Sequence, residues 1–140
     1  MDINIIQVYA PTADKEEPII EEFYEQLNSL IKLTKSDEIT IIIGDFNAKI
    51  GKGKEEDLVG EYGLGLRNDR GNRLSQFCKE QQLIVSNTFF QLPPRRLYTG
   101  AAPGDTAGHI IRNQIDYITI SKRFRNSIKS VKAYPGAGVA

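Results

Sequence analysis

The chain has 140 residues, of which 40% are hydrophobic and 26% are charged, which fits one globular domain or part of one. No apolar run approaches the roughly 18 residues of a membrane-spanning helix, and the acidic, strand-like start does not resemble a signal peptide. One cysteine, Cys78, and one histidine, His109, exclude a disulfide framework, a thiolate zinc site and a His-rich metal cluster from these residues. We therefore expect an intracellular protein that makes no contact with a membrane.

The net charge of zero conceals two unlike halves. Residues 1–66 carry 6 Lys and Arg against 14 Asp and Glu, whereas residues 67–140 carry 12 against 4. A basic half can attract an anionic partner such as nucleic acid. The two halves can also attract each other within one fold, and on charge alone we favour this second interpretation.

The first part of the chain predicts a strand, a helix and a second strand. Residues 3–9 are apolar and β-branched, which is typical of a buried strand, and Pro11 ends it. Pro18 suits a first helical turn, and apolar residues then recur at helical spacing as far as Ile31. Residues 39–43 are almost continuously apolar, which predicts a strand covered on both faces.

The rest of the chain is less regular. Residues 44–71 are rich in glycine and weakly periodic, which predicts mostly loop. Beyond them the pattern predicts, in chain order, a helix over 72–82, a strand over 83–87, a short strand beginning at 98–99, a loop over 100–113, a strand over 114–121, a turn over 122–126 and a strand over 127–134. Alternating strands and helices without a linker or a repeat indicate one layered α/β or α+β domain.

The first chemical candidate is the segment Gly44-Asp45-Phe46-Asn47, directly after the strongest predicted strand. Sheets of α/β proteins often place their sites beyond the end of such a strand. The Asp45 carboxylate can bind a cation or orient water, and the Asn47 amide can donate a hydrogen bond to a phosphoryl oxygen. An ordinary Asx-turn that ends the strand is the structural alternative.

Two further candidates are Asp116 and Tyr9. Strand alternation puts Asp116 on one face with Ile118 and Ile120, where a buried carboxylate needs a partner, unless it is exposed at the strand start. Tyr9 ends the first strand, and taken alone it is an ordinary core or rim residue. His109 lies in a loop between Gly108 and Ile110 and is expected to be exposed to solvent.

Four segments, residues 8–12, 44–51, 67–71 and 113–118, together resemble the endonuclease/exonuclease/phosphatase superfamily, which has the DNase-I-like fold. Within it they are most similar to the endonuclease domains of LINE-type retrotransposons and to craniofacial development protein 2-like proteins, and residues 135–137 match the same group. The resemblance covers nearly the whole chain. It implies an α+β fold in which residues 1–140 form a partial four-layer αββα sandwich.

The resemblance also implies a role for each candidate. Asp45 matches the Asp that orients or deprotonates the attacking water, and Asn47 matches the Asn that holds the scissile phosphate. Tyr9 matches the Tyr that contacts this phosphate, and Asp116 matches the Asp that orients a catalytic histidine. The implied reaction is Mg²⁺-dependent phosphodiester hydrolysis, with DNA as the substrate and the nucleus as the compartment.

The resemblance places two parts of the family's catalytic machinery outside residues 1–140. The metal-binding Glu precedes the segment that contains Tyr9, and the Ser-Asp-His element follows residues 135–137. We therefore expect weak or no nuclease activity and doubtful Mg²⁺ binding from this chain, and no metal ligand is assigned. The alternatives are a phosphatase of the same superfamily, or a non-catalytic remnant that binds a protein or nucleic acid through its basic half, with phosphate contacts from Arg67, Arg70, Arg73, Arg95, Arg96 and Arg112.

Overall fold

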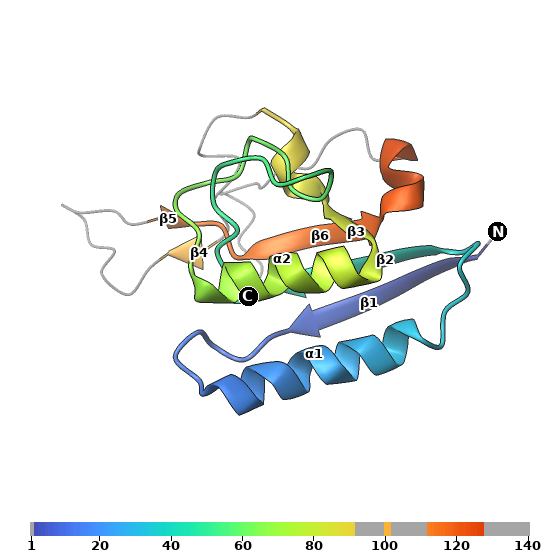
Figure 1. The fold of residues 1–140 in the computed structure, drawn as a ribbon, viewed down its shortest axis with the longest axis horizontal. Coiled ribbons are helices and arrows are strands. Elements are labelled where there is room, and N and C mark those ends of the chain that lie inside the picture. Colours follow the sequence, from blue (N-terminus) through green and yellow to red (C-terminus); the bar gives the residue numbers. More distant parts are fainter. Residues whose placement is uncertain (1, 92–99, 102–111, 128–140) are drawn as a thin grey trace.

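A computed structural model describes residues 2–91, 100–101 and 112–127 (Figure 1). The elements in chain order are β1 (Ile3–Tyr9), α1 (Glu17–Ile31), β2 (Ile39–Asp45), α2 (Asp69–Gln81), β3 (Leu83–Val85), the 3₁₀ helix η1 (Ser86–Phe89), β4 (Gly100–Ala101), β5 (Arg112–Asn113), β6 (Asp116–Ser121) and the 3₁₀ segment η3 (Lys122–Ser127).

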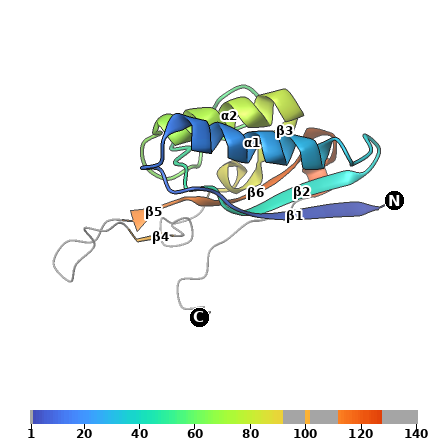
Figure 2. The same cartoon turned by 90° about the horizontal axis from the view of Figure 1, so that it is seen from below.

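Four strands form one sheet in the order β1-β2-β6-β3. The β1 and β2 strands are parallel, whereas β6 runs antiparallel to both of its neighbours. Both long helices lie on the same side of this sheet, as Figure 2 shows. The α+β class is thus confirmed, and the described elements form one helical layer on one β layer. In this part of the chain neither helix is long and apolar enough to cross a bilayer.

The hydrophobic core lies between the sheet and the two helices. The α1 helix buries Ile20, Tyr24 and Leu27, which recur at the spacing of one helical face. They pack with buried residues of α2 and of the strands, among them Phe77 and Ile42. The Tyr24 and Phe77 rings lie 5.2 Å apart between centroids, so the two helices share one aromatic contact above the sheet.

The opposite face of the sheet is much more exposed, and here the sequence prediction is wrong. The β1 strand is the edge of the sheet rather than a buried strand, with 58% of Ile3 and 68% of Ile5 exposed. The β2 strand is not fully covered on both faces either, because 37% of Ile43 is exposed. We call Ile3, Ile5, Ile41, Ile43 and Ile118, which share this side of the sheet, the open isoleucine face.

Several element boundaries also differ from the predictions. The α2 helix begins at Asp69 rather than at residue 72, because the Asn68 side chain caps it by accepting a hydrogen bond from Gly71 N at 2.8 Å. The predicted strand over 83–87 ends at Val85. Part of the predicted loop over 100–113 pairs as β4 and β5. Residues 98–99, His109 and the predicted strand beyond Ser127 lie outside the described residues.

The ion pairs of the described residues explain much of the charge split. Each of the five joins an acidic residue of the first half to a basic residue of the second. They are Arg67–Glu55, Arg70–Glu17, Arg73–Glu21, Lys79–Glu56 and Lys122–Asp57. In the described part of the chain, therefore, the two halves attract each other within one fold.

Candidate active site

Three of the four candidate residues lie in one row across the sheet. In the strand register, Tyr9 of β1 pairs with Asp45 of β2, and Asp45 pairs with Asp116 of β6. Directly paired residues of neighbouring strands point to the same face, with Cβ atoms about 4.5–5.5 Å apart in antiparallel pairs. Tyr9 is 78% exposed, and the two Asp residues are partly exposed. The row therefore presents a phenol and two carboxylates on the side of the sheet that the helices leave open.

Asp45 also shapes the turn that follows β2. Its Oδ1 accepts a hydrogen bond of 2.8 Å from the Asn47 backbone nitrogen, which is an Asx-turn. Asn47 adopts a left-handed conformation with φ of 45°, which asparagine tolerates better than most residues. The structural alternative for this segment is thus present. It does not compete with a chemical role, because the carboxylate has a second oxygen and the turn holds Asp45 in place.

Asn47 joins this turn to the end of β1. Its side-chain Nδ2 donates to the Ala10 carbonyl at 2.8 Å, and the Ala10 backbone nitrogen donates to the Asp45 carbonyl at the same distance. An amide nitrogen carries two protons, so one proton of Nδ2 is used and the other is available to a ligand. Asn47 therefore lies beside the row at the end of the first two strands.

Sequence reasoning missed that Gly44 is required for this arrangement. Gly44 has φ of 145°, and a Cβ placed there would lie 2.1 Å from the Val8 carbonyl oxygen. Only glycine tolerates both the conformation and the close approach. A glycine directly before the Asp is the sequence signal, but it points to a requirement only once the neighbouring strand is known.

The loop after β2 is held by a second missed residue, Tyr117. Its buried hydroxyl accepts a hydrogen bond from Ile50 N at 3.0 Å and donates one to the Gln114 carbonyl at 2.6 Å. The Gln114 side chain is also buried, and its Oε1 accepts from Leu64 N at 3.2 Å. Burial raises the pKa of Tyr117, so the hydroxyl stays neutral. These bonds tie two points of the glycine-rich loop to β6 and to the residues just before it.

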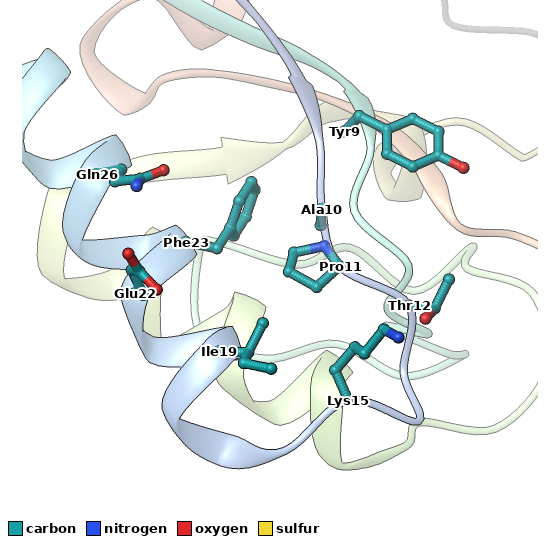
Figure 3. A pocket seen from close by; sticks show the side chains of 9 residues that line it. All are labelled: Tyr9, Ala10, Pro11, Thr12, Lys15, Ile19, Glu22, Phe23 and Gln26. Carbon is teal, nitrogen blue, oxygen red and sulfur yellow. The ribbon is translucent and has the colours of Figure 1, made fainter.

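A pocket of about 500 Å³ lies next to this edge and shares only Tyr9 with the row. It is lined by Tyr9, Ala10, Pro11, Thr12, Lys15, Ile19, Glu22, Phe23 and Gln26. Figure 3 shows the Tyr9 ring directed away from Phe23 and Ile19, which form the apolar wall on α1. One wall of the pocket thus belongs to α1, whereas the Tyr9 hydroxyl is directed away from that wall.

Three arginines that the sequence offered as phosphate contacts are paired within the fold. Arg67 donates to the Ile50 carbonyl at 2.9 Å and pairs with Glu55, and its side chain is 26% exposed. The Arg70 and Arg73 side chains are 14% and 15% exposed and pair with acidic residues of α1. These pairings make the three guanidinium groups part of the fold, and phosphate contact by them stays a prediction. Arg95, Arg96 and the Arg112 side chain lie outside the described residues.

The donor set of the row fits part of a magnesium site. Mg²⁺ prefers oxygen ligands and commonly keeps several waters while one or two carboxylates hold it. Asp45 and Asp116 supply two such carboxylates, and the two residues are directly paired across β2 and β6. The described residues contain no group of three or more His, Cys, Asp or Glu that could enclose a metal ion. Burial raises the pKa of Cys78 to about 12, which removes this thiol as a metal ligand or nucleophile.

Comparison with known proteins agrees with these observations. Residues 3–101 match the family model described as endonuclease-reverse transcriptase. Craniofacial development protein 2 from Bos taurus and from Tragulus javanicus are each 43% identical over 136 residues, which is 97% of this chain. The chain spans only 22% and 23% of those relatives.

A solved structure shares the fold. The endonuclease domain of TRAS1, a telomere-specific non-LTR retrotransposon, superposes with a TM-score of 0.55 at 18% identity, over 84% of this chain and 44% of that one. The expected DNase-I-like architecture is thereby confirmed for the described part. The chain belongs to the endonuclease-reverse transcriptase family of the endonuclease/exonuclease/phosphatase superfamily.

Proposed function

We propose that this chain forms part of a Mg²⁺-dependent DNA endonuclease domain, and that the row of Tyr9, Asp45 and Asp116, with Asn47 beside it, binds the scissile phosphodiester. The observation that carries the proposal is the register Tyr9–Asp45–Asp116 across three strands. Residues from three separate segments meet at one end of the sheet, which is the requirement for positioned acid–base groups. Membership of this family supports the proposed reaction class.

Each residue has a task that its position allows. The Asp45 carboxylate, held by the Asx-turn, orients a water molecule and accepts its proton through the oxygen that the turn leaves over. Asn47 directs its second Nδ2 proton at a phosphate oxygen, and the exposed Tyr9 hydroxyl donates to the same group. By family resemblance, Asp116 orients an imidazole that lies outside these residues.

A bound Mg²⁺ would stabilise the negative charge that develops on the phosphate oxygens. The Asp45 and Asp116 carboxylates would hold it, together with water.

The metal proposal is tested by NMR with Mn²⁺, which can replace Mg²⁺ and broadens nearby resonances. We expect a trace of Mn²⁺ to broaden the backbone amides of residues 45–47 and 115–117, and excess Mg²⁺ to reverse the broadening. Asp45→Asn should abolish the effect, whereas Asp37→Asn, an exposed residue just before β2, should not. Broadening centred on the acidic α1 helix, or none at all, would contradict the proposal.

The reaction is tested by nicking of supercoiled plasmid in Mg²⁺. We expect the 140-residue chain to nick weakly or not at all, because the resemblance places the metal-binding Glu and the Ser-Asp-His element outside it. Strong nicking that Asp45→Asn removes would overturn the expectation of weak activity and support the site. Strong nicking that survives this substitution would overturn the site itself.

The substrate class has its own test. The same row can act on a phosphomonoester, since the superfamily contains phosphatases. We expect any turnover to favour a diester such as bis(p-nitrophenyl) phosphate over p-nitrophenyl phosphate. Preference for the monoester would support the phosphatase alternative. A location in the nucleus, tested by imaging a tagged chain, is a further part of the proposal.

A further inference from the structure

Residues at the N-terminus of α2 contact two segments next to the candidate site: the segment after β2 and the turn after β1. Asn68, the helix cap, holds the segment after β2. Its Oδ1 accepts hydrogen bonds from Gly71 N at 2.8 Å and from Lys49 N at 3.0 Å, and its own backbone nitrogen donates to the Lys49 carbonyl at 3.1 Å. These bonds attach the start of α2 to Lys49, which lies two residues beyond Asn47 in the chain.

Arg70 holds the other segment, the turn between β1 and α1. Its Nη2 donates to the Lys15 carbonyl at 2.7 Å and its Nε to the Ala13 carbonyl at 3.3 Å. Its Nη1 lies 2.8 Å from Glu17 Oε1. The side chain is only 14% exposed, so one guanidinium group satisfies three acceptors along this turn.

The two held segments meet at the contact between Asn47 and Ala10. Asn47 Nδ2 donates to the Ala10 carbonyl, and Ala10 comes directly after Tyr9 at the end of β1. The chain of contacts therefore closes, from Arg70 through the turn to Ala10, on to Asn47, and back through Lys49 to the start of α2. A shift of the turn at one end changes the carbonyl that orients the Asn47 amide at the other.

We propose that Arg70 is a positioning residue for this edge: it fixes the turn after β1 and so sets the orientation of the Asn47 amide toward a bound phosphate. The significance for phosphate binding rests on the proposed function, whereas the positioning itself does not. Arginine suits the task because its rigid planar fork spreads its donors over acceptors that lie apart, whereas the three donors of lysine all belong to one nitrogen.

Arg73 provides a matched control on the same helix. Its Nε lies 2.6 Å from Glu21 Oε2, and its guanidinium lies 4.4 Å from the centre of the Tyr24 ring. It is as buried as Arg70 and ties the same two helices together, but none of its described contacts involves the turn over residues 10–15. Loss of Arg73 should therefore destabilise the fold without reorienting Asn47.

The test compares Arg70→Gln, Arg70→Lys and Arg73→Gln in the full chain, using the Asn47 side-chain amide signals in ¹H–¹⁵N spectra and thermal unfolding. We expect Arg70→Gln to shift these signals and to speed their hydrogen exchange several-fold, and Arg70→Lys to recover little of the loss. Arg73→Gln should lower the melting temperature while leaving the Asn47 signals in place.

Unchanged Asn47 signals in folded Arg70→Gln, or equal changes in Arg73→Gln, would overturn the proposal. If Arg70→Gln does not fold, Glu17→Gln gives a milder test, because it removes only the negative charge of one acceptor. We expect a small shift of the Asn47 signals. The absence of any shift would contradict the proposal. The measurement uses neither metal nor DNA. Failure of the positioning role is thus distinguishable from failure of the endonuclease proposal.

Discussion

Tyr117 of β6 and Ile50 of the glycine-rich loop are joined by a buried hydrogen bond, 3.0 Å from the Ile50 backbone nitrogen to the Tyr117 hydroxyl. The same hydroxyl donates to the Gln114 carbonyl. The strand that supplies Asp116 and the loop that follows Asp45 therefore depend on one phenol. Since a buried polar group left without a partner is costly, this oxygen is a sensitive point of the fold.

Tyr117→Phe should destabilise the protein by about 1–3 kcal/mol, because it leaves a buried N–H and a buried carbonyl without their partner. Urea unfolding followed by circular dichroism gives the free energy of unfolding. Tyr62→Phe is the control, since the partly exposed Tyr62 hydroxyl makes no hydrogen bond within the described residues, and it should be nearly neutral. Equal losses in the two variants would contradict the role of Tyr117.

Gly44→Ala should destabilise the protein much more than Gly53→Ala. Both glycines have positive φ, 145° and 126°, and a strained backbone of this kind costs about 1–3 kcal/mol for other residues. A Cβ at Gly44 also meets the Val8 carbonyl oxygen, whereas a Cβ at Gly53 has nothing within 4 Å. Urea midpoints measure the difference, and similar midpoints would show that β1 can move away from β2 at little cost.

The Arg73–Glu21 pair should couple more strongly than the Lys79–Glu56 pair in double-mutant cycles. The first pair is 2.6 Å long with Arg73 15% exposed, whereas the second is 3.1 Å long between side chains that are 62% and 58% exposed. Exposed pairs typically contribute about 0.2–1 kcal/mol, and salt screens them further. We expect the coupling of the first pair, measured with glutamine substitutions, to survive 0.5 M salt better, because salt screens a partly buried pair less than an exposed one. The reverse order would contradict this.

Stability should depend on pH through Glu55. Burial by itself would raise the pKa of Glu55, but hydrogen bonds from Ser75 and Arg67, with the charge of Arg67, hold it below its ordinary value of 4.5. A lowered pKa in the folded state means that the ionised carboxylate stabilises the fold. This contribution is complete above the unfolded pKa and is lost as the pH falls through the lower folded pKa.

Glu55→Gln should therefore destabilise the protein at pH 7, and its difference from the parent chain should shrink below the ordinary pKa of a glutamate. Glu56→Gln, in an exposed pair on the neighbouring residue, is the control and should show a smaller difference at pH 7. Chemical unfolding over a series of pH values measures both. A Glu55→Gln difference that stays constant with pH would show that the carboxylate charge is not involved.

The sequence predicted the main strands and helices because their patterns depend only on residues that are close together in the chain. The apolar residues of α1 recur at helical spacing, and the run of isoleucines in β2 is typical of a strand. The same isoleucines could not reveal that one side of β1 and β2 is open, because a strand pattern does not say which layers cover it. The start of α2 was missed since Asn68, an ordinary polar residue in sequence, acts as a cap only when Gly71 folds back onto it.

The sequence identified the segments that carry the candidate site, but it did not predict how their residues pair across the sheet. Tyr9, Asp45 and Asp116 become neighbours only because β2 lies between β1 and β6, and strand order is decided by tertiary packing. The supporting roles of Gly44, Tyr117 and Arg70 depend on contacts between segments far apart in the chain. The charge split favoured attraction between the two halves, but only the structure shows which arginine pairs with which acid.

The pairing of an acidic first half with a basic second half also has a consequence for the unfolded chain. Two blocks of opposite charge on one polymer attract each other even without fixed contacts, so the denatured ensemble should be more compact than that of a chain with mixed charges. Added salt should then expand the unfolded protein while it weakens the ion pairs of the folded one. Such an attraction brings α1 and α2 near each other before either has a partner, and the early encounters of folding would be biased toward the native helical layer.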